Sequence, residues 1–207
     1  MILGVDHLAL TATDTDQAKK MLEAKGLKCV FIERNAPNDP SKKILLEHYQ
    51  PTHDLAVFQS TSGGVSIEIT NHGTQLADNI APYHYKDDYI ELHTTDIQAE
   101  TIFWQKALYF NKVEKKILKF TSPVPNWSCT LKLKEVSILK TCTLDGKGYP
   151  CLALLTNNLI QDTKNIVDSG AKDVAKPFKS FINNKPLDII MFRTPTGAIC
   201  ELIQIGK

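Results

Sequence analysis

The sequence predicts an α+β fold built from repeated β-α-β-β-β units that form cupped mixed sheets. Three observations predict it. The order strand, helix, strand, strand, strand occurs three times along the 207 residues, residues 6–14 align without a gap to residues 88–96, and the strand around Glu68 resembles the strand around Glu201. A unit of about 60 residues buries too little surface to be stable alone, so the units must pair.

The first unit begins with alternating apolar residues that predict a strand over 5–11. Asp14 or Thr15 can cap a helix with apolar residues at 18, 21 and 22, and Gly26 is a typical helix end. Further strands are predicted over 27–33, 44–48, 54–60 and 65–70, with a proline-containing loop over 35–41 and a turn at Gly63-Gly64.

The second unit is predicted as a strand over 88–95, a helix from 96 to about 109, strands over 112–120, 129–133 and 136–143, and a loop over 123–126. The third is a strand over 151–156, a helix over 159–169, and strands over 173–175, 187–192 and 198–203. We expect residues 1–80 to form the first unit and residues 86–207 to hold the paired second and third units. The first unit would then pair with its counterpart in another chain, which predicts a homodimer.

The composition excludes several classes of partner. The chain has 24 lysines and arginines against 23 acidic residues, a net charge of +1, and its only arginines are Arg34 and Arg193, so neither bulk attraction to nucleic acid nor arginine readout of bases is expected. No apolar run approaches the roughly 20 residues of a membrane helix, and no membrane partner is expected. Five cysteines without a C-x-x-C pattern, and no signal peptide at the first residues, predict reduced thiols in the cytoplasm.

Three segments resemble the vicinal oxygen chelate superfamily, which includes glyoxalase I, bleomycin-resistance proteins, methylmalonyl-CoA epimerase and extradiol dioxygenases. They are residues 6–10 (Asp-His-Leu-Ala-Leu), 66–69 (Ser-Ile-Glu-Ile) and 196–202 (Thr-Gly-Ala-Ile-Cys-Glu-Leu). The resemblance covers nearly the whole chain and implies a glyoxalase-like fold, in which two units close an eight-stranded cup. It also implies a divalent transition metal in the cup, held by a His on the first strand and a Glu on the last strand of each unit. Such a donor set suits zinc, nickel, iron, cobalt or manganese.

The resemblance assigns His7 and Glu68 in the first unit and Glu201 in the third, whereas Tyr89 and Cys151 occupy the other two His positions. Strand alternation places two further residues on the face of Tyr89, and these are Glu91 and His93. The expected metal ligands are His7, Glu68, His93 and Glu201, the expected catalytic bases are Glu68 and Glu201, and the expected substrate contacts are Tyr89, Glu91 and Cys151. The remaining histidines are expected to face solvent, and they are His48, His53, His72 and His84.

The sequence leaves the function open and favours an enzyme. The leading hypothesis is a metal-dependent isomerase or lyase that acts on a small oxygenated substrate. A non-catalytic binder of the bleomycin-resistance type is the first alternative, because two lost histidines can leave an apolar cup suited to sequestering a ligand. A divergent extradiol-type dioxygenase is the second, because Tyr89, Cys151 and Glu201 follow the order of a His-His-Glu site.

Overall fold

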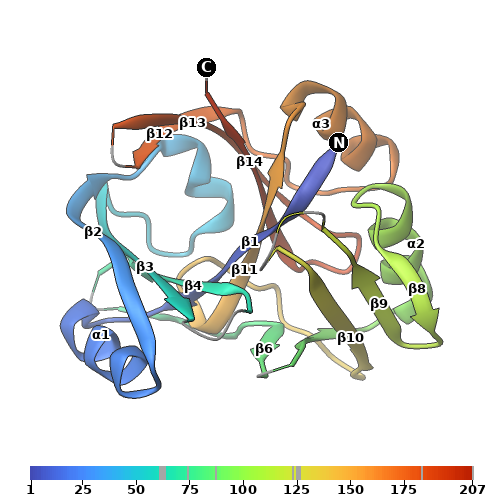
Figure 1. The fold of residues 1–207 in the computed structure, drawn as a ribbon, viewed down its shortest axis with the longest axis horizontal. Helices are drawn as coiled ribbons and strands as arrows, with labels where there is room; N and C mark the ends of the chain where they lie inside the picture. Colours follow the sequence, from blue (N-terminus) through green and yellow to red (C-terminus); the bar gives the residue numbers. More distant parts are fainter. Residues whose placement is uncertain are drawn as a thin grey trace.

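The computed structural model describes residues 1–60, 64–73, 75–86, 88–122, 124, 127–182 and 184–206. The turn expected at Gly63-Gly64 and the loop expected over 123–126 lie partly outside these residues. The chain forms three β-α-β-β-β units, which confirms the predicted fold class (Figure 1).

The first unit consists of β1 (Ile2–Thr11), α1 (Thr15–Ala24), β2 (Leu27–Pro37), β3 (Thr52–Ser60) and β4 (Ser66–Asn71). Asp14 caps α1 by accepting hydrogen bonds from two backbone N–H groups of its first turn. The strand expected over 44–48 is wrong, because this segment includes the end of a 3₁₀ helix, η1 (Pro40–Leu45). Pro40 suits a helix start, and Asp39 caps it by accepting from the Ser41 N–H.

The second unit follows two short strands, β5 (Ala77–Ile80) and β6 (Tyr83–Tyr85). It consists of β7 (Ile90–Thr94), α2 (Ile97–Lys106), β8 (Asn111–Glu114), β9 (Ile117–Phe120) and β10 (Cys129–Glu135). The single strand expected over 112–120 is therefore a hairpin. The strand expected over 136–143 is wrong: Asn79 and Arg193 bind the backbone of Thr143 and Cys142, where a neighbouring strand would otherwise do so.

The third unit consists of β11 (Gly146–Thr156), α3 (Leu159–Asp168), β12 (Phe178–Ile182), β13 (Lys185–Arg193) and β14 (Ile199–Ile205). The strand expected over 173–175 is wrong, since only an isolated bridge joins Lys172 to Arg193 there.

The units pair differently from the sequence-based expectation. β1 pairs with β11 in antiparallel fashion, and the sheet runs β2-β3-β4-β1-β11-β14-β13-β12. The first and third units therefore close the cup within one chain. The expected pairing of the second and third units is wrong, and the homodimer expected through the first unit loses its premise.

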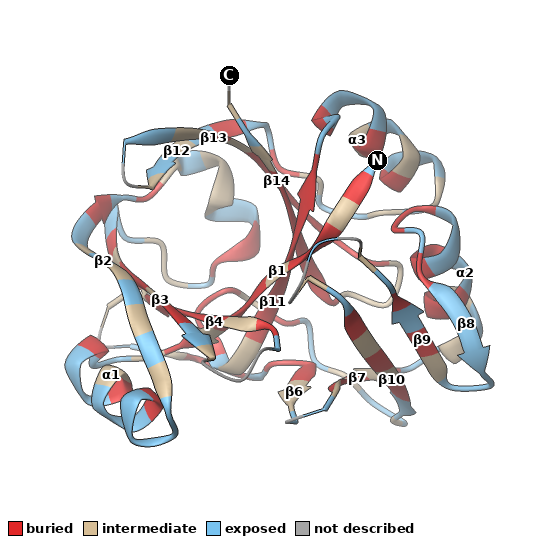
Figure 2. Cartoon of the chain, viewed as in Figure 1, coloured by how far each residue is buried: buried red, intermediate tan, exposed pale blue. Residues whose placement is uncertain are grey.

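Burial explains this choice of partners. β11 is buried on both faces from Pro150 to Thr156, so it is suited to the centre of a sheet. On β7 the buried positions alternate with less buried polar ones, as on a sheet with one open face. Figure 2 shows the buried strands at the centre of the cup and the exposed residues on β2, α1 and β8.

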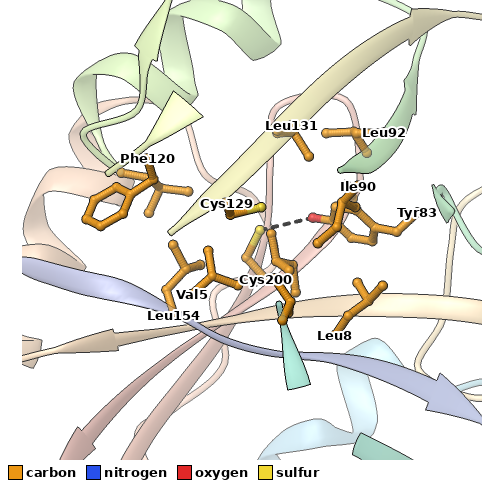
Figure 3. Close-up of a cluster of buried hydrophobic side chains, with 14 of the residues drawn as sticks. Val5, Leu8, Tyr83, Ile90, Leu92, Phe120, Cys129, Leu131, Leu154 and Cys200 are labelled. Carbon is orange, nitrogen blue, oxygen red and sulfur yellow. Dashed lines mark hydrogen bonds between the residues drawn. The ribbon is translucent and has the colours of Figure 1, made fainter. Parts of the chain in front are cut away.

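The second unit forms a sheet with the order β6-β7-β10-β9-β8, joined to the cup through β6 and β11. Its apolar face packs on the helix-covered side of the cup, where Ile90 and Leu131 join Leu8 and Leu154 in one hydrophobic core (Figure 3). The Tyr83 hydroxyl lies 3.3 Å from the Cys200 sulfur within this core. The second unit thus supports the back of the cup and leaves its hollow side open. In the described part of the chain, no helix is both long and apolar enough to cross a membrane.

Candidate active site

The hollow side of the cup contains a cavity of about 440 Å³. Strands of the first and third units supply most of its wall, and η1 contributes Lys42. The wall is largely apolar, and apart from Lys185 its charged and imidazole side chains fall into two groups. One group, at the centre of the cup, contains His7, Glu68 and Glu201.

The sheet register brings these three side chains together. Glu68 pairs across from Ala9 on β1, and Glu201 pairs across from Ala153 on β11, so the two carboxylates occupy equivalent positions in their units. The small alanine side chains leave room between them. His7 Nε2 lies 3.6 Å from Glu68 Oε1 and 3.8 Å from Glu201 Oε2. All three residues are buried, with at most 9% of their surface exposed.

Asp6 fixes the orientation of His7. The Asp6 carboxylate lies 2.8 Å from His7 Nδ1, while His7 Nε2 is buried without a hydrogen-bond partner among the described residues. A carboxylate at one ring nitrogen holds the proton there and leaves the other nitrogen as a lone-pair donor. Nε2 therefore points between two carboxylates, and its lone pair becomes available to a metal ion once the ring loses its second proton.

The charges around His7 favour a cation at this point. Burial opposes protonation of His7, but Glu68, Asp6 and Glu201 outweigh it and raise the pKa of His7 from 6.5 to about 10. Burial, opposed by the His7 cation and reinforced by the Glu68 charge, raises the pKa of Glu201 from 4.5 to about 7. A proton or a metal ion would each relieve this crowding of negative charge.

The donor set fits a divalent transition metal. One imidazole nitrogen and two carboxylates suit zinc, iron, cobalt, nickel or manganese. Two metal–ligand bonds of ~2.0–2.2 Å span at most about 4.4 Å, and both separations from His7 Nε2 are shorter than this. Across the described residues, no three His, Cys, Asp or Glu side chains are already arranged as a finished metal site. An ion would therefore have to draw the carboxylates inward.

Cys151 lies at the position of the third unit that corresponds to His7. It faces Ala9 across the β1–β11 pair, just as His7 faces Ala153, and its side chain lines the cavity. Burial and the charge of Glu201 raise the pKa of this thiol well above its usual value. In the absence of a metal it is a neutral, polarisable part of the wall.

The structure does not bring Tyr89, Glu91 and His93 into the cup, and the expectation that His93 completes the site is wrong. These residues lie on the open face of the second sheet. His93 Nε2 lies 2.9 Å from Glu91 Oε1, and Lys132 lies 3.7 Å above the Tyr89 ring. Because the first unit, not the second, pairs with the third, Tyr89 cannot share a cup with Cys151 and Glu201. The dioxygenase hypothesis loses its basis.

The second polar group of the cavity was missed by the sequence reasoning. His53 and His72 were expected to face solvent, but only 4% and 5% of their surface is exposed. Both line the cavity together with Lys42. The signal available in the sequence was the alternation along β3, which places His53 on the same face as Leu55 and Val57.

No protein-family model matches the chain, and no curated protein matches it by sequence. The chain is similar in structure to methylmalonyl-CoA epimerase from Mycobacterium tuberculosis, with 13% identity, a TM-score of 0.49, and coverage of 100% of this chain and 91% of that one. It is also similar to glyoxalase I from Zea mays, with 18% identity, a TM-score of 0.43, and coverage of 97% and 67%. A putative dioxygenase from Bacillus subtilis matches at 12% identity and a TM-score of 0.43, over 100% and 64% of the two chains. Identities this low concern the fold alone.

Proposed function

We propose that this chain, which has the glyoxalase-like fold of the vicinal oxygen chelate superfamily, is a metal-dependent isomerase or lyase acting on a small oxygenated substrate. One observation carries the proposal. Within the described part of the chain, the His7 Nε2 atom is buried without a hydrogen-bond partner and lies within 4 Å of two buried carboxylates, in a cavity large enough for a small molecule. Burying one imidazole between two carboxylates is costly for stability, which favours a functional role.

Each residue has a defined task in this proposal. His7, Glu68 and Glu201 would hold the ion, and Asp6 would keep His7 in the tautomer that presents Nε2. The bound ion would supply Lewis-acid polarisation of a substrate oxygen. Glu68 and Glu201 lie on opposite sides of His7, so either carboxylate can accept or return a proton at a carbon next to that oxygen.

Metal analysis of site variants tests the proposal. The protein is prepared without a chelating tag or chelator, and its metal content is measured for the wild type, His7→Gln and Glu68→Gln. The matched controls are His84→Gln and Glu91→Gln on the second sheet. We expect about one transition-metal ion per chain in the wild type and both controls, and a large loss in both site variants. Equal metal content in all five proteins, or none in any after incubation with zinc, cobalt and manganese, would contradict the proposal.

Activity is tested on the same proteins. Proton exchange next to the carbonyl of 2-oxo and 2-hydroxy compounds is followed by NMR in heavy water. Exchange by the wild type that is lost in Glu68→Gln and kept in Glu91→Gln would support an enzyme.

A non-catalytic binder is the second candidate function. It is favoured by the neutral Cys151 thiol in the place of a fourth ligand and by the largely apolar cavity wall. A binder predicts thermal stabilisation by an apolar ligand that a chelator leaves unchanged. The enzyme predicts that the chelator abolishes both exchange and any metal-dependent stabilisation.

A further inference from the structure

Three side chains form a second polar cluster in the cavity, away from His7. His53 lies on β3, His72 follows β4, and Lys42 projects from η1. Because Asp54 pairs with Asn71 across β3 and β4, His53 and His72 are direct neighbours at the end of this strand pair. Their rings stack with centroids 5.1 Å apart and an interplanar angle of 29°.

One ring nitrogen of each histidine has no partner in the described part of the chain. These atoms are His53 Nδ1 and His72 Nδ1, and both are buried without a hydrogen bond there. Among the residues that the structure describes, Lys42 Nζ has no ion pair or hydrogen bond, and it lies 5.0 Å above the Phe178 ring. Histidines that only fill space are normally satisfied by backbone or side-chain partners. Two imidazoles that each have an unsatisfied nitrogen, beside an ammonium group without an ion pair, therefore indicate that a ligand completes the cluster.

The charge of the cluster is positive. The carboxylates whose charges raise the pKa values of these histidines are Asp54 and Asp145, and both are engaged elsewhere. Asp54 binds Arg34 at 2.6 Å, and Asp145 accepts from two backbone N–H groups of residues 47 and 48. Burial and then the Lys42 charge lower the pKa of His53 to about 2 and that of His72 to about 4, so both rings are neutral at neutral pH. A neutral imidazole still donates one N–H hydrogen bond.

We propose that Lys42, His53 and His72 bind the carboxylate group of the ligand that occupies the cavity. The ammonium group supplies the charge, and the two imidazoles supply N–H donors from buried, fixed positions. This inference extends the proposed function by naming the substrate class, but carboxylate binding at this cluster does not require the metal.

The spacing along β4 restricts the ligand further. Glu68 and His72 lie four residues apart on the same face, with Thr70 between them on the cavity wall. Four residues of strand span roughly 13 Å at ~3.3 Å per residue. Leu55 and Val57 line the same wall on β3. The ligand is therefore a carboxylic acid with an apolar chain several carbons long between its carboxylate and the oxygenated end at His7.

Binding of a matched acid and alcohol tests this subsite. Octanoate and 1-octanol have the same chain and differ at the head group. Their affinities are measured by isothermal titration calorimetry in EDTA, so that no metal contributes. We expect the wild type to bind octanoate at least tenfold more tightly than 1-octanol, because only the carboxylate can pair with the ammonium group.

Variants of the cluster show which side chains cause the preference for octanoate over 1-octanol. Lys42→Met keeps the length of the side chain without its charge, and it should reduce octanoate affinity about tenfold while leaving 1-octanol unchanged. The double variant His53→Phe/His72→Phe keeps the ring stack without its donors and should also lose the preference. The control is Lys43→Met, because Lys43 is exposed and lies 4.8 Å above the Tyr49 ring outside the cavity.

The outcomes separate this inference from the proposed function. Equal binding of acid and alcohol, no binding of either, or an acid preference that survives in Lys42→Met would overturn the carboxylate subsite. None of these results changes the metal content expected at His7. Conversely, acid selectivity in a chain that never binds metal would keep the subsite and remove the metal-dependent enzyme.

Discussion

The buried state of His72 predicts that acid destabilises the protein in a way that one substitution can remove. Burial and then the Lys42 charge lower the pKa of His72 from 6.5 to about 4 in the folded chain. Between these values the unfolded state binds more protons than the folded state, so stability falls as the pH drops below 6.5. Above pH 6.5 His72 is neutral in both the folded and the unfolded chain, so this loss of stability is absent there.

The size of the effect follows from the pKa gap. A pH of about 4.5 lies 2 units below the pKa of the imidazole in the unfolded chain, and each unit is worth ~1.36 kcal/mol, or about 2.7 kcal/mol in all. The folded ring is itself partly protonated at this pH, so the net cost to the folded state is about 2.5 kcal/mol. His72→Phe keeps the stack on His53 and removes the titrating group. From pH 7.5 to 4.5, the variant should therefore lose about 2.5 kcal/mol less free energy of unfolding than the wild type.

Urea denaturation at both pH values measures this difference. His48→Gln serves as control, because 30% of the His48 side chain is exposed and it does not line the cavity; it should follow the wild type. If His72→Phe and the wild type lose the same free energy of unfolding on acidification, the burial of His72 in a neutral state is refuted.

Three further predictions concern residues around the site and the core. Asp6→Asn should weaken metal binding by about 10–100-fold, because the ring of His7 loses its orienting carboxylate; calorimetric titration with cobalt measures this, and unchanged affinity would contradict it. Glu100→Ala should lower the free energy of unfolding by about 3 kcal/mol, because two buried side-chain donors and one half-buried donor lose their acceptor; a urea midpoint equal to that of the wild type would count against it. Gly146→Ala should cost about 1–3 kcal/mol, since the new Cβ would lie 2.1 Å from Asn79 Oδ1; a wild-type melting temperature would show that this contact relaxes freely.

The fold class could be predicted because its signals are local. Alternating strands, capped helices and the repeat around His7 and Tyr89 each occupy about ten residues of sequence. The pairing of the units was not predicted, because it depends on which strands are apolar on both faces. The sequence held two hints: β11 is apolar on both faces, and only the first and third units end with a strand that carries an inward glutamate, Glu68 or Glu201.

The candidate site was predicted where the repeat itself carries the side chain. His7, Glu68 and Glu201 occupy the same positions in repeated strands, and the structure brings them together. His93 was misplaced because its assignment depended on the wrong unit pairing. Lys42, His53 and His72 were missed because their meeting depends on η1 folding over the cup, and a histidine at a strand end looks the same in sequence whether it is buried or exposed.

The position of a bound metal ion tests the central claim most directly. Crystals of the protein grown with cobalt or manganese allow the ion to be located from its anomalous scattering. The account predicts one site with the ion about 2.0–2.2 Å from His7 Nε2 and from oxygens of Glu68 and Glu201. An ion bound instead at Glu91 and His93 on the open sheet, or a fully occupied cavity ligand with no ion beside His7, would contradict it.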